Sequence, residues 1–520
     1  MLLFFILVLI MVVLYSVFFL FSNTLLIQGS LCLTLGVGQC YVLASDSSSS
    51  TFAVTLFLIS VSVLIWSFYY IDSEPEFRTF VSLLLCFLVS IFILVFSADL
   101  LRLFVAWDLL GFTSFFLVVY YRTRVSLAGG LLTGLSNRVG DVLLLIIFGY
   151  SPFRSCGVLS SPILILLWVS FTKSAQVPFS RWLPSAMTAP TPVSALVHSS
   201  TLVTAGVFLL YRLIPCSSVI LSAVGIFTML IAGTSACLEC DIKKIIALST
   251  LSHLGLIITT LGLFSRSYTF SHLVIHAAFK ALLFLAVGTA IHGCYGSQES
   301  RSMESLARRS ALVMLVLIIA LSSNVGLVFS SGYVSKEALL LKIFNNGLGF
   351  IFVVLFYFGI GLTLFYSLRL LTCLASSHFR TLQSCGSGSV PLVVKVPLLL
   401  LALLTIIQGC RSVLVPPSST GLVCLVDQIL VFGVFVIICC LYLLKSPAPF
   451  IYSLPSSQLL IRTSGLSRCF VTLDLVQGTE VAILQGFGLG CARTLVSQAS
   501  MSAPVLGKVL VLITFVFFIV

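Results

Sequence analysis

Eight ionisable residues lie within or beside long apolar runs of the chain, where a charge is costly. A charged side chain at the centre of a membrane helix costs roughly 2.5–3.5 kcal/mol on insertion scales, and it usually marks an ion pathway or a proton relay. The sequence therefore predicts a proton relay inside a membrane. Its members are Asp108, Lys173, His198, His272, His276, Lys280, Lys336 and Glu337.

The segment 171–201 combines a charge with residues that break helices. Lys173 closely follows the apolar run ILILLWVS, so it is expected deep inside a span. Pro178 removes a backbone donor and crowds the preceding turn, which should break or bend the helix. Broken helices with a charge are tolerated in a membrane only where they face protein or a wet cavity. We expect Pro178, Pro190 and Pro192 to shape an ion site there.

A second segment, 324–345, repeats this design further along the chain. The run SSG interrupts an apolar helix just before Lys336 and Glu337. Two interrupted helices in corresponding places, each with a buried lysine, are typical of transporters built from structural repeats.

Asp108 is the expected partner of Lys173. A carboxylate paired with an ammonium can stay charged at membrane depth, and separating the two favours release of the lysine's proton. The alternative is a carboxylate that only caps a helix end near the membrane surface. Arg138 and Asp141 are three residues apart on one helix, which predicts a local ion pair with a structural role.

The histidines follow the lysines along the chain. His198 comes after a pair of prolines, and an imidazole that titrates near neutrality can pass protons between buried groups. His272, His276 and Lys280 are spaced by four, so they share one helix stripe. The alternatives are a hydrogen-bonded core histidine and a polar seam between helices. Arg369, near a span end, is expected to be a supporting residue that reaches the membrane surface.

Composition indicates what positions these residues. The chain has 520 residues, of which 59% are hydrophobic and 8% are charged, against about 25% charged in soluble proteins. Apolar runs of about 20 residues follow one another, which leaves no room for a soluble catalytic domain. We attribute the net charge of +12 to membrane orientation and not to nucleic acid. An all-α polytopic membrane protein with about 16 transmembrane helices is expected.

The apolar runs set the predicted spans. The first run lacks a basic leader and a cleavage site, so a retained span is expected there and not a signal peptide. Residues 446–503 are polar and glycine-rich, which favours the membrane surface. The predicted spans are 1–22, 24–44, 51–71, 79–98, 100–120, 128–149, 161–180, 190–212, 217–239, 243–264, 269–293, 308–345 (broken), 348–375, 392–412, 421–445 and 504–520.

Motifs for bound groups are missing from the sequence. Cysteines are scattered singly, and the one CxxC, Cys237 to Cys240, has no second pair to complete a metal site. There is no haem-attachment motif, glycine-rich phosphate loop, zinc spacing or nucleophile elbow. We therefore expect no metal, cofactor or redox centre in this chain.

The run KSAQVPFSRWLPSAMTAPTPVSALVHSSTLVTAG resembles the signature of the antiporter-like, proton-pumping subunits of respiratory complex I. Four further blocks resemble that family in the same order: DIKKIIALSTLSHLG at 241–255, HAAFKALLFLAVG at 276–288, SGYVSKE at 331–337 and FYSLR at 365–369. Lys173, His198, Lys280 and Lys336 stand where the family places its proton-channel residues. Asp108 stands where it has a glutamate.

The resemblance implies two inverted five-helix repeats, each with a broken helix, and a lateral interfacial helix before the last span. The corresponding division is 1–78 for N-terminal spans, 79–212 and 213–375 for the two repeats, 376–445 for C-terminal spans, 446–503 for the lateral segment and 504–520 for the final anchor.

The resemblance also implies a function and a location. The chain is expected to be a multi-pass core subunit of H⁺-translocating NADH:ubiquinone reductase in the mitochondrial inner membrane, with NADH, FMN, Fe–S clusters and ubiquinone bound by other subunits. Expected partners are other membrane-arm subunits, especially the adjacent antiporter-like chain 4, and lipids. The alternatives are a cation/proton antiporter subunit of the multi-subunit bacterial type and a scaffold that transports nothing.

Overall fold

The computed structural model describes residues 31–33, 41–43, 47–71, 74–97, 100–150, 160–213, 218–263, 266–294, 296–300, 310–327, 330–333, 335–336, 339, 350–375 and 391–414. The predicted spans 1–22, 421–445 and 504–520, the predicted lateral segment 446–503, and Glu337 lie outside these residues.

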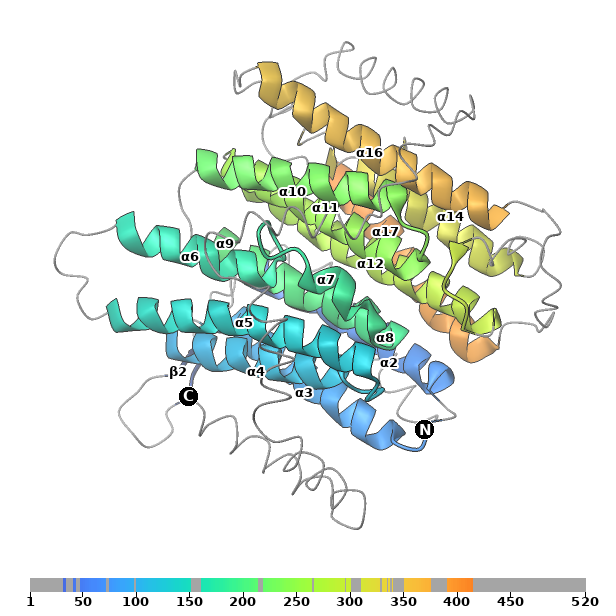
Figure 1. Cartoon of the computed structure of the whole chain (residues 1–520), viewed down its shortest axis with the longest axis horizontal. Helices are drawn as coiled ribbons and strands as arrows, with labels where there is room; N and C mark the ends of the chain where they lie inside the picture. Colours follow the sequence, from blue (N-terminus) through green and yellow to red (C-terminus); the bar gives the residue numbers. More distant parts are fainter. Residues whose placement is uncertain are drawn as a thin grey trace. The chain divides into compact units, whose positions relative to one another are not determined.

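Long apolar helices make up most of what is described (Figure 1). Ten helical segments among these residues are long and apolar enough to cross a membrane, so the expected multi-pass, helical membrane protein is confirmed. The total of about sixteen spans stays a prediction. The helices are α2 (Ser47–Tyr70), α3 (Phe77–Phe96), α4 (Leu100–Val118), α5 (Arg124–Tyr150), α6 (Ser160–Lys173), α7 (Trp182–Ser185), η3 (Ala186–Thr188), α8 (Thr191–Val193), η4 (Ser194–Thr201), α9 (Leu202–Leu213), α10 (Val219–Leu238), α11 (Ile242–Gly262), α12 (Arg266–Gly293), α14 (Ala311–Val325), α16 (Phe350–Ala375) and α17 (Leu392–Leu414).

The segment predicted as a span at 24–44 differs from the expectation in its described part. Leu31–Leu33 (β1) and Tyr41–Leu43 (β2) form a two-stranded antiparallel sheet, with Leu31 opposite Leu43. The sequence explains the difference, because the segment between the strands contains Gly36 and Gly38, which disfavour a helix.

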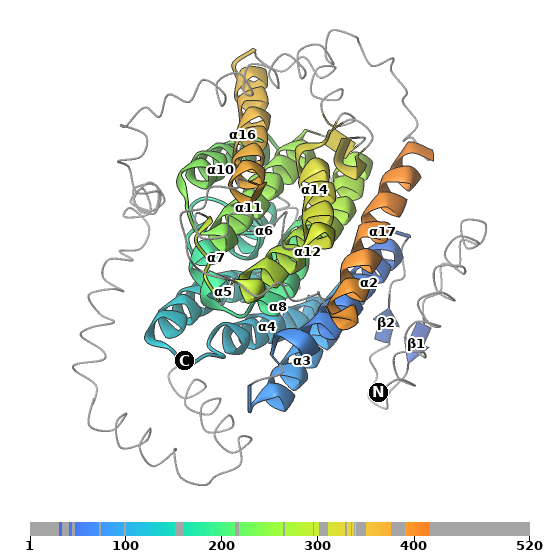
Figure 2. The same cartoon turned by 90° about the vertical axis from the view of Figure 1, so that its right-hand side faces the viewer.

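Central helices are buried by their neighbours, and outer helices keep one apolar face exposed. Residues 191–210 are all buried, as is every residue of α11 except Lys244, whereas α5 exposes Leu135, Val139 and Val142. An exposed stripe of large apolar side chains on a spanning helix is the surface that faces lipid. Figure 1 shows α10 and α11 side by side, and Figure 2 shows α17 beside α2.

Helix α6 ends at Lys173, which confirms a broken helix at this place. The span was predicted to continue to residue 180, but the backbone leaves the helical conformation earlier, at Ala175 with a φ of 55°. Pro178 lies in the non-helical stretch that follows, before the short helix α7. The lysine therefore stands at the end of a half-helix and not in its interior.

Helix α14 ends in the same way, at Val325. Gly326 has a φ of 81°, the left-handed conformation that glycine adopts without strain. Its N–H and that of Leu327 donate to the carbonyl of Ser322 at 2.9 and 3.1 Å. The break was predicted at the SSG run, 330–332, but it precedes that run, and residues 331–333 are already helical again.

The helix that carries His198 is wound as a π-helix over Ser194–Thr201. Hydroxyl groups accompany the wider turn: Thr201 donates to the carbonyl of Leu196 at 2.7 Å, and Ser200 donates to the same carbonyl at 3.0 Å. Such hydrogen bonds from side chains to carbonyls four or five residues earlier satisfy carbonyls where the regular backbone hydrogen bonds of the helix are distorted. π-Helical turns occur frequently at functional sites.

Replacing Gly206 by Ala should separate α9 from the broken end of α6. A Cβ added at Gly206 would lie 2.9 Å from both the carbonyl oxygen of Ser170 and the backbone nitrogen of Ser174. We expect a loss of about 1–3 kcal/mol of stability from this overpacking, measured as a lower thermal-unfolding midpoint of the detergent-solubilised protein. Gly149→Ala is the matched control, since nothing lies within 4 Å of a Cβ there. Equal midpoints for both variants would contradict the close contact.

Candidate functional site

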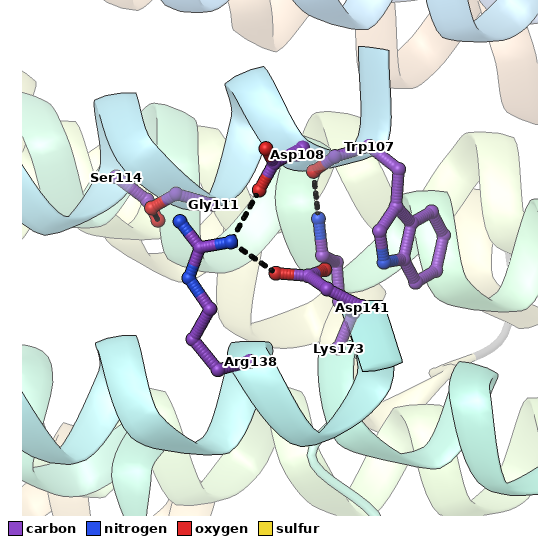
Figure 3. A network of polar contacts seen from close by, with 7 residues as sticks. All are labelled: Trp107, Asp108, Gly111, Ser114, Arg138, Asp141 and Lys173. Atoms are coloured by element: carbon purple, nitrogen blue, oxygen red, sulfur yellow. Dashed lines mark hydrogen bonds and ion pairs between the residues drawn. The ribbon is translucent and has the colours of Figure 1, made fainter. Parts of the chain in front are cut away.

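Four charged residues from three helices form a first charged cluster: Asp108 of α4, Arg138 and Asp141 of α5, and Lys173 of α6 (Figure 3). Nη1 of Arg138 lies 2.9 Å from Oδ1 of Asp108 and 3.6 Å from Oδ2 of Asp141. The local ion pair predicted between Arg138 and Asp141 is therefore present. The same guanidinium lies 4.1 Å from the ring centroid of Phe112, a cation–π contact.

Lys173 is fully buried and is held by α4. Its ammonium donates to the main-chain carbonyl of Trp107 and lies 4.2 Å from the centroid of that residue's ring. As the last residue of α6 it also stands where the helix dipole favours a cation. Asp141 and Asp108 both attract it electrostatically.

The predicted pairing of Asp108 with Lys173 is not a direct ion pair in the structure. Within the described residues, Asp108 makes its ion pair with Arg138. The physical reason is that the planar guanidinium of Arg138 presents several donors in a fixed fork and reaches both carboxylates, whereas the Lys173 ammonium is directed at the carbonyl of Trp107. Two carboxylates and two cations give the cluster no net charge, which is the condition for tolerating buried charges.

His198 lies beside this cluster on η4, next to an indole. Its ring centroid is 6.0 Å from that of Trp182, and Nε1 of Trp182 donates at 2.9 Å to the carbonyl of Thr172, the residue before Lys173. Both ring nitrogens of His198 are buried without a hydrogen-bond partner among the described residues. They are therefore open to accept or donate a proton.

A second group, the histidine–lysine cluster, lies on α11, α12 and the segment after α14. All of its side chains are buried, with at most 5% exposed. Because α12 is covered by neighbouring helices, the stripe predicted from the spacing of four faces protein and not lipid. The members are His253, His272, His276, Lys280 and Lys336.

His253 was not identified from the sequence as a site residue. Its ring stacks on His272 with centroids 5.7 Å apart and lies 5.6 Å from the ring of His276, so it joins the two histidines of α12. The sequence signal was a histidine in the middle of the spanning segment that became α11, within the block DIKKIIALSTLSHLG. Within the described part of the chain, both ring nitrogens of His253 and of His276 are buried without a partner.

The two lysines of this cluster are held by neutral oxygen atoms. Lys280 donates to Oγ of Ser249 at 2.7 Å and to Oδ1 of Asn324 at 2.6 Å. Lys336 donates to the main-chain carbonyls of Asn324 at 2.7 Å and of Val325 at 3.0 Å, the end of α14. Asn324 was not identified from the sequence, where it is one polar residue at the start of the second broken segment.

A serine connects the two elements of the cluster. Nδ1 of His272 and Oγ of Ser335 are 2.8 Å apart, which joins α12 to the residue before Lys336. The chain of contacts from His253 through His272 to Ser335 therefore leads to Lys336. Among the residues that the structure describes, no group of three or more His, Cys, Asp or Glu is arranged to hold a metal ion.

The predicted supporting residues occupy helix ends. Pro190 is the N-cap of α8, and Pro192 lies in its first turn. Arg369 of α16 donates to the main-chain carbonyl of Cys237 at the end of α10, with Cys240 Sγ at 3.9 Å from its guanidinium. These three residues therefore fix helix termini around the two clusters.

Comparison with known proteins gives a consistent family. Residues 97–363 match the family described as NADH:quinone oxidoreductase/Mrp antiporter, transmembrane. Three relatives named NADH-ubiquinone oxidoreductase chain 5 are 42% identical over 66% of the chain (Ascaris suum), 43% over 62% (Caenorhabditis elegans) and 38% over 75% (Lumbricus terrestris). The chain spans 64%, 63% and 70% of those relatives' lengths, respectively. The resemblance stated from the sequence blocks is confirmed.

A solved structure shares the fold. The Mrp complex from Dietzia sp. DQ12-45-1b contains a chain that matches with a TM-score of 0.70 at 23% identity, covering 94% of this chain and 56% of that one. The likeness supports an antiporter-like arrangement of helices.

Replacing Arg138 by Met should destabilise the first charged cluster, because two carboxylates then face one lysine. We expect a loss on the order of 2 kcal/mol, below that of a fully buried pair since the Arg138 side chain is 42% exposed. Adding Asp141→Asn restores neutrality and should recover most of the loss. The measurement is a double-variant cycle on the thermal-unfolding midpoint of the detergent-solubilised protein.

The same exchange at Arg124, which is exposed at the start of α5, is the control and should leave the midpoint unchanged. If the double variant loses as much as the two single variants together, the guanidinium does not balance both carboxylates.

Proposed function

Because the chain belongs to the NADH:quinone oxidoreductase/Mrp antiporter transmembrane family, we propose that it is an antiporter-like subunit of respiratory complex I that moves protons across the membrane. The names of its relatives support this assignment over others in the family. The whole complex is then an H⁺-translocating NADH:ubiquinone reductase of the mitochondrial inner membrane. NADH, FMN, Fe–S clusters and ubiquinone belong to other subunits, and the neighbours are membrane-arm subunits, chain 4 among them, and lipids.

The observation that supports this proposal most directly is the burial of three lysines inside a bundle of membrane-spanning helices. Lys173 and Lys280 are 0% exposed, and Lys336 is 5% exposed. A purely structural core would be more stable with apolar side chains at these places, because desolvating a cation is expensive even when it is paired. Ion transport is the usual reason for keeping such groups at membrane depth.

In the proposed mechanism the first charged cluster is where a change in charge outside the chain first alters the protonation of a buried lysine. Arg138 is shared by Asp108 and Asp141, so a change in charge near its half-exposed guanidinium redistributes the carboxylates between Arg138 and Lys173. The ammonium of Lys173 is thereby stabilised or destabilised, and its proton is taken up or released. His198, beside Trp182 at the end of α6, is the acceptor closest to this lysine in the proposed order.

In the same mechanism the histidine–lysine cluster carries the proton onward to the end of the relay. His253, His272 and His276 pass the proton between ring nitrogens, and Lys280 and Lys336 hold it at the end of α14. Glu337 follows Lys336 in the sequence and is proposed as the last group of the relay.

We also propose that the two halves of the chain are the inverted repeats of the family, at 79–212 and 213–375. Support comes from the two broken helices, since each ends beside a buried lysine: the Lys173 ammonium donates to a carbonyl of α4, and that of Lys336 donates to carbonyls at the end of α14. Residues 1–78, 376–445, 446–503 and 504–520 are proposed as N-terminal spans, C-terminal spans, lateral helix and final anchor. This division follows the family's arrangement.

A cation/proton antiporter subunit is the second candidate. It is favoured by the fold shared with a chain of an Mrp complex. Sodium-dependent proton movement by vesicles that hold the chain without any NADH-oxidising partner would support it over the complex I subunit.

Replacing Lys336 by Met should abolish proton translocation through this chain, and Lys173→Met should do the same. Methionine fills the volume of the lysine stem without a proton-carrying group, so the complex should still assemble. The measurement is the number of protons moved per NADH oxidised by the purified complex in liposomes, with native gels to check assembly. Lys395→Met is the control, because Lys395 lies on α17 outside both clusters. An unchanged proton-to-NADH ratio in both cluster variants would count against the function.

A further inference from the structure

Asn324 holds both lysines of the histidine–lysine cluster at once. Its side-chain carbonyl accepts from Lys280 at 2.6 Å, and its main-chain carbonyl accepts from Lys336 at 2.7 Å. The residue is 1% exposed, and its Nδ2 is buried without a hydrogen-bond partner in the described part of the chain. One residue therefore presents two oxygen atoms to two separate amines.

The acceptors around these lysines are neutral. Lys280 is bound by a serine hydroxyl and an amide, and Lys336 by two peptide carbonyls. Among the described residues, no carboxylate lies within ion-pair distance of either lysine, in contrast to the first charged cluster. Because the two amines also repel each other electrostatically when charged, the site favours one ammonium and one neutral amine.

The backbone holds Asn324 in a fixed place. It is the second-last residue of α14, and Gly326 then turns the chain with a φ of 81°. A Cβ at Gly326 would lie 3.0 Å from Cδ of Lys336, and a Cβ at Gly332 would collide with the carbonyl oxygen of Ser323. The returning segment is therefore packed directly against the end of α14, which aims the Lys336 side chain at the carbonyls of Asn324 and Val325.

Tyr366 of α16 completes the surroundings. Its hydroxyl is 3.3 Å from Oγ of Ser252 on α11. The amide of Asn324 is oriented by Lys280, which donates to its Oδ1. An amide fixed in this way can hold an ammonium without forming the tight ion pair that a carboxylate would form.

We propose that Asn324 is the positioning residue that couples Lys280 to Lys336, a role that rests on the proposed function. It holds the two nitrogen atoms on one rigid neutral acceptor so that a proton can pass between them. In that step an N–H bond of the Lys280 ammonium breaks, an N–H bond forms on the neutral amine of Lys336, and the total charge of the pair is unchanged. The amide itself carries no proton.

The test separates the side chain of Asn324 from its backbone. Asn324→Leu removes the acceptor of Lys280 but keeps the carbonyl that binds Lys336. Without that acceptor the Lys280 ammonium is no longer held toward Lys336, and misplacing a reacting group by about an ångström slows a transfer step, so we expect transfer through this chain to slow at least about 10-fold. In the reconstituted complex, Asn324→Leu should therefore remove most of the proton translocation that Lys336→Met removes.

A second variant guards against a simple folding defect. Asn324→Asp keeps the size and the acceptor but adds a negative charge, which should retain the proton on Lys280 and lower translocation by a similar factor in a fully assembled complex. Ser323→Ala is the matched control, since the Ser323 hydroxyl bonds only to the carbonyl of Ala320 among the described residues, and it should translocate normally.

A double variant tests whether Asn324 acts through Lys280. Lys280→Met with Asn324→Leu should translocate no less than Lys280→Met alone, whereas an additional independent loss would overturn the coupling role. If Lys336→Met blocks translocation but both Asn324 variants translocate normally, the inference about Asn324 fails and the proposed function stands. If Lys336→Met itself translocates normally, the proposed function fails.

Discussion

The cost of keeping an ammonium group away from water governs the arrangement of this bundle. Each buried lysine needs oxygen atoms that accept hydrogen bonds from its ammonium. Because α14 ends inside the bundle, the carbonyls of Asn324 and Val325 are free to accept from Lys336. Lys173, at the end of α6, donates instead to the carbonyl of Trp107 in α4, and Lys280 of the unbroken helix α12 donates to side-chain oxygens. Intact helices pack against both broken ones, α5 and α9 against α6 and α12 against α14.

The two clusters solve the same problem with different chemistry. Around Lys173, two carboxylates and a guanidinium balance the charge, and the arginine remains 42% exposed on the side chain. Around Lys280 and Lys336, the acceptors within the described residues are an amide, a hydroxyl and peptide carbonyls. Ionised side chains that share one guanidinium can be redistributed by an outside charge, whereas neutral acceptors hold an ammonium without the strong ion pair that a carboxylate would form. The difference fits an input and an output of one relay.

Apolar run length was sufficient to predict the spans that the structure describes as α2, α3, α4 and α10, because spanning a bilayer sets both length and composition. The break before Lys336 was placed too late, since a left-handed glycine at 326 ends the helix before the more conspicuous SSG run. Spacing along one helix predicted the contact of Arg138 with Asp141. The spacing could not predict that Asp108 would form its ion pair with Arg138 and not with Lys173. Nor could it predict the positions of His253 and Asn324, because these contacts join side chains from different helices.

The π-helical stretch η4 has a geometric consequence for the segment that carries His198. A π-turn holds one residue more than an α-turn, so the helix after it is rotated by about 100° relative to an uninterrupted α-helix. The direction of the His198 imidazole relative to the face of α9 that packs at Gly206 therefore differs from the direction it would have in an uninterrupted α-helix. Removing a single residue from this stretch would rotate every side chain that follows it relative to those before it, so the segment should tolerate deletions poorly even where the deleted residue is not His198.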